Sequence, residues 1–345
     1  MLTDSFYLCS MQKNEIHKVL VIQTASIGDV ILVTPVLEKL HHFYPGIHID
    51  LLIKQGFESL FEGHPFIHQL LLWDKKKDKY KHLWHLLKEI RSERYDLVVN
   101  VQRFLSTGFL TVFSGASQTV GFDKNPLSYF YSTRIRHSIG DKKSVLHETD
   151  RNLSLIKHLT DSKSQTPKLY PTPKDIAKMS QYKTNPYICI APASLWFTKQ
   201  FPADKWIEFL QNVPSGIFVY LLGSAADEAL CSHILLSSEH PNCINFAGKL
   251  SLLESAALMR DAQMNYVNDS APMHLCSSVN ARMTAIYCST VPSFGFGPLA
   301  DDALVVETTE KLDCRPCGLH GHKTCPEGHF KCAHTIDINQ LAVRL

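Results

Sequence analysis

Short, wholly apolar runs alternate with longer amphipathic segments along most of the chain, and this alternation is the strongest constraint on its fold. In the first half the runs are KVLVIQ, IDLLI, QLLLW and DLVVNVQ, at 18–23, 49–53, 69–73 and 96–102. Strands that are apolar on both faces are typical of buried parallel sheets, and the segments between them are long enough for crossover helices. The sequence therefore predicts a doubly wound α/β domain.

The same pattern restarts after a segment of different composition. From Leu159 to Pro186 the chain is rich in Pro, Lys, Ser and Thr, which favours a linker over a core element. Further apolar runs follow at 187–192, 217–223, 243–248, 264–269 and 283–287. We therefore expect two Rossmann-like domains, 1–170 and 187–345, joined by a linker at 171–186 and facing each other across a cleft. Ligands of such sheets bind at the carboxyl ends of the strands.

Composition excludes several classes of protein. The chain has 345 residues, 45% of them apolar and 20% charged, as expected for a globular protein with two cores. No apolar run approaches the ~18 residues of a membrane helix, and residues 1–18 lack the pattern of a secretory signal, so we expect a cytoplasmic protein. A net charge of +2 argues against a broad nucleic-acid-binding surface.

The first candidate site follows the first strand, where TASIGD at 24–29 opens a helix. Gly28 permits close approach of the backbone, the helix N-terminus offers N–H groups, and Asp29 lies at the cleft. The alternative is that Asp29 only complements the helix dipole. The turn is not a G-x-G-x-x-G motif and no Walker lysine follows it, so spacing alone does not decide.

A second turn, APASLWFTKQFP at 191–202, again follows a strand. Its Ser194, Thr198 and Lys199 offer hydroxyls and one positive charge, which suit a diphosphate. The alternative is a surface loop in which Lys199 is simply solvated.

A third turn, VNDSAPMH at 267–274, places Asp269 and Ser270 between a strand and a helix, with His274 one turn further on. Backbone donors and the Ser270 hydroxyl suit an anion here too. An N-cap role explains Asp269 equally well, and His274 is also explained as a hydrogen-bonded structural histidine.

Taken together, the motifs resemble glycosyltransferase family 9, the ADP-heptose:lipopolysaccharide heptosyltransferases. The resemblance rests on KVLVIQTASIGDVILVTPVL, TKQFPADKW, GSAADE, LLESAALMRDAQMNYVNDSAPMHLCSS and the FGFGP turn, and it covers nearly the whole chain. It implies a GT-B fold and an inverting transfer of heptose from ADP-heptose to a lipid-A-core glycolipid. It implies neither a cofactor nor a catalytic metal.

The resemblance also implies roles for individual residues. Asp29 matches the general base that deprotonates the acceptor hydroxyl, and the acceptor side further includes Ser26, Gly28 and Arg103. Asp227 matches the acidic residue that holds the ribose, and Leu250 the apolar residue against adenine. The full set implied in donor binding is Ser194, Thr198, Lys199, Asp227, Leu250, Asp269, Ser270, Ala271 and His274. Ala271 stands where the family has glycine, so donor geometry is expected to differ slightly.

Two alternatives to this function stay open: a GT-B transferase that uses another nucleotide sugar, and a non-catalytic carbohydrate- or nucleotide-binding relative. The C-terminal cysteines also allow more than one interpretation. Zinc binding, packing as reduced thiols, and a disulfide are each compatible with the spacing of Cys314, Cys317, Cys325 and Cys332.

Basic residues of the first half suggest where a glycolipid acceptor is met. The candidates are KKKDKYKH at 75–82 together with Arg134, Arg136, Lys142 and Lys143. Either they contact anionic lipid at the cytosolic face of the inner membrane, or they form a solvated loop surface.

Overall fold

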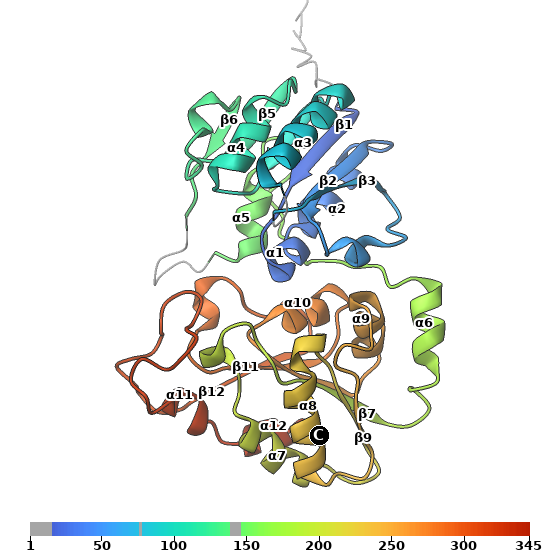
Figure 1. The fold of residues 1–345 in the computed structure, drawn as a ribbon, viewed down its shortest axis with the longest axis vertical. Helices are drawn as coiled ribbons and strands as arrows, with labels where there is room; N and C mark the ends of the chain where they lie inside the picture. Colours follow the sequence, from blue (N-terminus) through green and yellow to red (C-terminus); the bar gives the residue numbers. More distant parts are fainter. Residues whose placement is uncertain (1–15, 76–77, 139–145) are drawn as a thin grey trace, which may run out of the picture.

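The computed structural model describes residues 16–75, 78–138 and 146–345, and it contains two parallel sheets of six strands each (Figure 1). The first sheet has the order β3-β2-β1-β4-β5-β6 and the second the order β12-β11-β10-β7-β8-β9. The strands of the first are β1 (Lys18–Ile22), β2 (His48–Lys54), β3 (Ile67–Trp73), β4 (Leu97–Asn100), β5 (Gln118–Phe122) and β6 (Thr133–Ile135). Those of the second are β7 (Tyr187–Ala191), β8 (Phe218–Leu221), β9 (Cys243–Asn245), β10 (Met264–Asn268), β11 (Met283–Tyr287) and β12 (Ala303–Glu307).

Helices cover both faces of each sheet, which explains why the strands are apolar on both sides. In β1, for example, Val19, Leu20, Val21 and Ile22 are all fully buried. The helices of the first half are α1 (Ile27–Ile31), α2 (Thr34–Phe43), α3 (Lys79–Glu93), α4 (Leu105–Val112) and α5 (Glu148–Ser154). Those of the second half are α7 (Ala203–Gln211), α8 (Glu228–Ser238), α9 (Leu252–Arg260), α10 (Ala271–Ser278), α11 (Lys331–His334) and α12 (Asn339–Ala342).

The predicted doubly wound α/β architecture is confirmed, and every predicted apolar run forms a strand. Strands β5, β6 and β12 were not predicted. Strand β5 contains polar residues and a glycine, and β6 has only three residues, two of them polar. The segment between the sheets contains a helix, α6 (Pro173–Ser180), which the composition did not predict. A capping box of Thr172 and Asp175 starts this helix. The domain boundaries at 171–186 stay a prediction.

The two halves of the molecule meet through α1 and α10. Figure 1 shows the first sheet with its helices above the second, with α1 facing α10 between them. Each of these helices begins just after a central strand, α1 after β1 and α10 after β10. The loops at the carboxyl ends of those strands therefore lie at the junction of the two halves. In the described part of the chain, no helix has the length and apolar character needed to cross a membrane.

Candidate functional site at the junction of the two sheets

Asp29 belongs to the capping box that begins helix α1. The Ser26 N–H and hydroxyl both donate to Asp29 Oδ2, at 3.0 and 2.6 Å. The Asp29 N–H in turn lies 3.4 Å from Ser26 Oγ. Asp29 therefore does have the structural role, at the N-terminus of the helix, that we considered as the alternative. Its other oxygen, Oδ1, accepts no hydrogen bond from the described residues, so one carboxylate oxygen is oriented by the cap and the other is available to a ligand.

Gly28 lies against the imidazole of His274 across the junction. A Cβ atom built on Gly28 would lie 2.9 Å from His274 Cδ2, closer than side chains tolerate. The close backbone approach that we predicted at Gly28 is therefore made to a side chain of α10. Only a glycine in this turn lets α1 and α10 pack at this distance.

His274 is held neutral in this contact. Burial, with the nearby charges of His147 and Lys199, lowers the pKa of His274 to about 3. Its Nδ1 is buried and has no hydrogen-bond partner within the described residues. The interpretation of His274 as a hydrogen-bonded structural histidine is therefore wrong, and an unpaired ring nitrogen remains at the junction.

Lys199 and Asp269 form a mostly buried ion pair. Lys199 Nζ lies 2.7 Å from Asp269 Oδ2, and the same oxygen accepts the Thr290 hydroxyl at 2.6 Å. The N-cap of α10 is Ser270, so the N-cap interpretation of Asp269 is wrong, as is that of Lys199 as a solvated surface lysine. The ion pair thus fixes the Lys199 ammonium group at the carboxyl end of β10.

The loop that carries Lys199 is fixed by the C-terminal segment, which sequence reasoning missed. Thr198 is 1% exposed, and its hydroxyl accepts the His322 N–H at 2.8 Å and the Ser289 hydroxyl at 3.0 Å. Gly321 has φ +74°, and a Cβ there would lie 2.9 Å from Thr198 Oγ1. The Thr198 hydroxyl is thus used to hold the loop. The glycines of GLHGH were the only signal of this close packing in the sequence.

The remaining predicted donor residues lie in other turns and helix starts of the second half. Ser194 is half-buried, and its carbonyl accepts Gln200 Nε2 at 2.6 Å. Asp227, after β8, forms a second capping box with Ser224, whose N–H and hydroxyl lie 2.8 and 2.7 Å from Asp227 Oδ2. Leu250 is half-buried and packs against the larger core. Ala271 is the first residue of α10 and is partly exposed. No described hydrogen bond joins these residues to the Lys199–Asp269 pair, and their roles stay predictions.

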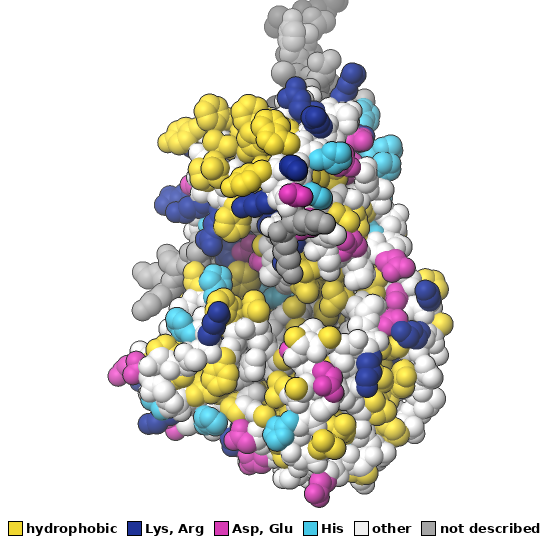
Figure 2. All heavy atoms as spheres, in the orientation of Figure 1, with side chains coloured by type: hydrophobic (Ala, Val, Ile, Leu, Met, Phe, Trp, Pro, Cys, Tyr) yellow, Lys and Arg dark blue, Asp and Glu magenta, His cyan; other side chains and the backbone are white. Residues whose placement is uncertain are grey.

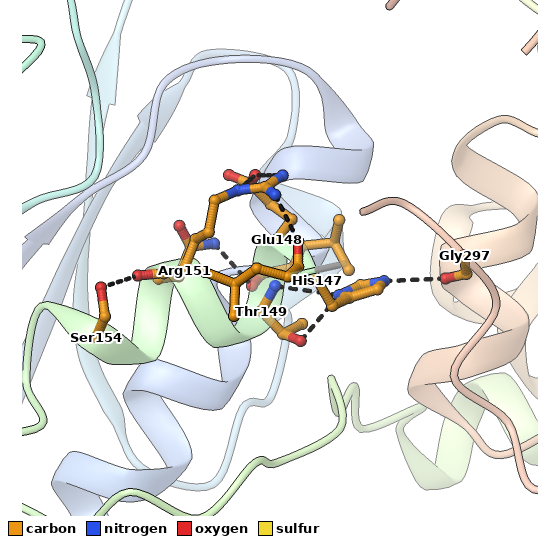
Figure 3. Close-up of polar contacts among 9 residues, drawn as sticks. His147, Glu148, Thr149, Arg151, Ser154 and Gly297 are labelled. Carbon is orange, nitrogen blue, oxygen red and sulfur yellow. Dashed lines mark hydrogen bonds and ion pairs between the residues drawn. The ribbon is translucent and has the colours of Figure 1, made fainter. Parts of the chain in front are cut away.

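The start of α5 forms a second contact between the halves that sequence reasoning missed (Figure 3). His147 caps the helix: its Nδ1 accepts the Thr149 N–H at 3.1 Å, which leaves Nε2 to donate to the Gly297 carbonyl at 3.0 Å. The Glu148 N–H donates to the Gly295 carbonyl at 2.8 Å. The FGFGP turn thus contributes backbone acceptors to the junction.

Glu148 links this contact to the first candidate site. Arg151 Nε donates to Glu148 Oε2 at 2.8 Å. Burial raises the pKa of Glu148, the Arg151 charge opposes that shift, and the Asp29 carboxylate adds to it. Arg103, exposed after β4, also acts to lower this pKa. Asp29 and Arg103 therefore both lie near Glu148 at the same end of the first sheet.

The cysteine-rich segment packs against the second core. Cys332 is buried, Cys325 is partly buried beside it, and all four cysteines are free. Burial and neighbouring thiols raise the pKa of Cys332 to about 11. Within residues 16–75, 78–138 and 146–345, no group of three or more His, Cys, Asp or Glu is placed to hold a metal ion. The burial of Cys332 agrees with the packing interpretation, and the zinc and disulfide interpretations stay predictions.

Comparison with known proteins identifies the family. The family model of glycosyltransferase family 9 (heptosyltransferase) matches residues 83–330. The chain belongs to glycosyltransferase family 9. It is 24% identical to lipopolysaccharide heptosyltransferase 1 of Pseudomonas aeruginosa over 80% of each chain. It is 27% identical to an Escherichia coli lipopolysaccharide heptosyltransferase 3 over 76% of this chain and 81% of the other.

Solved structures confirm the GT-B fold. A glycosyltransferase of family 9 from Veillonella parvula superposes with a TM-score of 0.80, at 24% identity over 95% of both chains. E. coli ADP-heptose heptosyltransferase II gives 0.73, at 19% identity over 94% of this chain and 99% of that one. An E. coli heptosyltransferase solved with ADP gives 0.69, at 18% identity over 94% and 98%. The family 9 enzyme described here is thus a glycosyltransferase whose relatives act in lipopolysaccharide heptose transfer.

The contact between Gly28 and His274 predicts a specific sensitivity. Gly28→Ala should lower the free energy of unfolding by about 1–3 kcal/mol, because the added methyl overlaps His274 and must push α1 from α10. Urea denaturation measures the change. Gly216→Ala is the matched control, since a Cβ at Gly216 meets nothing within 4 Å. Equal stability of the two variants would contradict the contact.

Proposed function

We propose that this enzyme transfers heptose from ADP-heptose to a glycolipid of the lipopolysaccharide core, with inversion and without a catalytic metal. The observation that carries the proposal is the placement of Asp29 and the Lys199–Asp269 pair on opposite sides of the α1–α10 contact. An acid-base group and a cation thus face one junction. The names of its relatives and the ADP in one related structure support the choice of donor and acceptor.

On the acceptor side, Asp29 accepts the proton of the attacking hydroxyl. The capping box holds Oδ2, so Oδ1 is the oxygen that takes the proton. The hydroxyl oxygen then forms a bond to the anomeric carbon while the bond from that carbon to the diphosphate breaks on the opposite face. One such displacement inverts the anomeric centre. Arg103, exposed at the end of β4, is placed to contact the acceptor's anionic groups.

On the donor side, the leaving ADP gains negative charge as the bond breaks. Lys199 supplies the compensating charge from its position beside Asp269. The Ser270 hydroxyl and the first N–H groups of α10 add hydrogen bonds, although Pro272 removes one of those donors. In this proposal side chains and a helix end stabilise the diphosphate. Asp227 then binds the ribose and Leu250 packs on adenine.

The proposal includes peripheral contact with the cytosolic face of the inner membrane, where such an acceptor is displayed. Lys76, Lys77, Lys142 and Lys143 lie outside the described residues. Lys75 is not a free surface lysine: its Nζ donates to the Thr24 carbonyl at 2.7 Å and to the Thr24 hydroxyl at 2.9 Å. Burial, with nearby Lys54 and Lys79, lowers its pKa to about 8. Of the predicted basic residues, Lys79, Lys81, Arg134 and Arg136 are exposed and remain candidates for this contact.

A choice of donors tests the proposal against its alternatives. Purified enzyme is supplied with a core-oligosaccharide acceptor and either ADP-heptose or other nucleotide sugars, and release of the nucleotide is measured. Turnover with ADP-heptose alone supports the proposal. Preference for another donor would identify a different GT-B transferase, and binding without turnover would identify a non-catalytic relative.

Asp29→Asn should reduce kcat by about 10²–10⁴-fold while leaving ADP affinity nearly unchanged, because it removes the base and keeps the volume. Steady-state kinetics and calorimetric titration with ADP measure the two effects. Asp175→Asn is the matched control, since Asp175 has the same capping-box role at α6. Near wild-type kcat for Asp29→Asn would exclude Asp29 as the base.

Lys199→Gln should weaken ADP binding by roughly tenfold to a hundredfold, since a charged hydrogen bond to phosphate is lost. Titration with ADP measures the change, and thermal unfolding checks that the variant folds with Asp269 unpaired. Lys205→Gln is the control, because Lys205 forms an ion pair with Glu208 on the same helix, α7. Unchanged ADP affinity would place the diphosphate elsewhere.

A further inference from the structure

Helix α4 carries large apolar side chains on its exposed side as well as on its buried side. Thr107, Leu110 and Thr111 are fully buried, whereas Leu105 and the flanking Phe104 and Phe113 are 59%, 50% and 48% exposed. The buried hydroxyls are satisfied locally: Thr107 Oγ1 donates to the Phe104 carbonyl at 2.9 Å, and Thr111 Oγ1 to the Thr107 carbonyl at 2.8 Å. The exposed side of this helix is therefore apolar where an ordinary surface helix is polar.

Neighbouring elements extend this apolar surface. Trp84 on α3 stacks edge-on against Phe109 with ring centroids 5.4 Å apart, and Phe109 lies 5.0 Å from Phe113. Asn125 Nδ2 donates to the Phe104 carbonyl at 3.0 Å, which ties the segment before η2 (Ser128–Phe130) to α4. We call the exposed side chains together the aromatic face: Tyr80, Trp84, Phe104, Leu105, Phe113, Tyr129 and Phe130. Figure 2 shows a broad hydrophobic area on the upper half of the molecule.

Cationic side chains lie directly against the rings of the aromatic face. Lys79 Nζ lies 5.8 Å from the centre of the Tyr80 ring, and the guanidinium carbons of Arg103 and Arg134 lie 6.0 and 4.4 Å from the Phe104 and Tyr129 rings. All three cations are exposed. Dark blue groups accordingly border the yellow area in Figure 2. The surface therefore combines an apolar centre with positive charge at its edge.

We infer that the aromatic face seats the enzyme in the interfacial region of an anionic lipid leaflet. Tyr and Trp side chains favour this region because they combine an apolar body with a polar tip, and Lys and Arg meet the lipid phosphates. A second copy of the chain fits the charges less well, since a two-fold interface on this face would place these cations opposite like charges.

This inference rests on the proposed function and specifies how its acceptor is met. Arg103 belongs to both surfaces: it lies against Phe104 and also acts on Glu148 beside Asp29. The aromatic face therefore reaches the entrance of the catalytic junction. A sugar whose lipid stays in the leaflet can enter there without leaving the membrane.

The first experiment measures co-sedimentation with phosphatidylcholine vesicles, with and without phosphatidylglycerol. The wild type should bind the anionic vesicles in a salt-sensitive way. A triple variant, Trp84→Ala, Leu105→Ala and Phe113→Ala, should lose about tenfold or more of the partition coefficient. Leu236→Ala, 75% exposed on α8, is the control for a lost surface hydrophobe. Arg134→Glu should weaken binding to the anionic vesicles, and Lys311→Glu, also at an exposed position, is its control. No binding by the wild type, or equal binding by the triple variant, would overturn the inference.

A second experiment separates insertion from adsorption and from self-association. Lipids with brominated acyl chains should quench part of the tryptophan emission, and Trp84→Phe should remove that part, since Trp73 and Trp206 are buried and the half-buried Trp196 belongs to the second half of the molecule. Absence of quenching would overturn insertion. Sedimentation velocity that shows a wild-type dimer split by the triple variant would identify a second copy as the occupant and likewise overturn it.

The nucleotide-release assay described above distinguishes a failure of this inference from a failure of the proposed function. The triple variant of the aromatic face should turn over a delipidated core oligosaccharide at the wild-type rate. It should turn over a vesicle-bound glycolipid more slowly than the wild type does. Equal rates on both would contradict a role in acceptor access. Vesicle binding itself needs no turnover, so it stays decisive if heptose is not the sugar transferred.

Discussion

The packing of Gly28 against His274 is the contact on which the rest of the site depends. It allows the backbone of α1 to approach the His274 ring of α10 closely. Each helix begins at the carboxyl end of a central strand, so their contact brings the loop of one sheet to the loop of the other. The hydrogen bonds from His147 and Glu148 to the FGFGP turn hold the same junction from α5. A larger residue at position 28 would push α1 away from α10. It would thereby separate Asp29 from the Lys199–Asp269 pair without changing either group.

The buried charges at the junction are better explained by ligand binding than by a contribution to the stability of the fold. Burying the Lys199–Asp269 pair costs desolvation that its attraction repays only in part, and a buried His274 with an unpaired nitrogen adds to the cost. Such groups are concentrated at functional sites. A diphosphate beside Lys199 would also raise the pKa of His274, because a nearby negative charge favours the imidazolium.

The local hydrophobic pattern was enough to predict most strands. The side-chain contacts depend on packing between segments that are distant in the sequence. Strands such as β1 and β7 were predictable because they are apolar on both faces. Strand β6, which includes Arg134 and has only three residues, gives no such signal. Asp29, Lys199 and Asp269 could be placed at strand ends from spacing alone. Their actual partners could not, since the pairing of Lys199 with Asp269 and the seating of Thr198 by His322 join segments far apart in the chain.

The apolar exposed side of α4 is the clearest case in which sequence and environment must be considered together. In LSTGFLTV both small hydroxyl and large apolar residues recur at helical spacing, so periodicity alone does not tell which face is buried. Packing decides it: the buried threonines satisfy their hydroxyls on the helix's own carbonyls, and their small size fits against the sheet. Leu110 joins the buried side, while Leu105 and the flanking Phe104 and Phe113 are left outside, where water disfavours them and an apolar medium does not. Because α4 begins close to Arg103, the helix that carries this surface starts near the proposed acceptor entrance. In the proposed function, the surface that contacts lipid thus adjoins the carboxylate that activates the sugar.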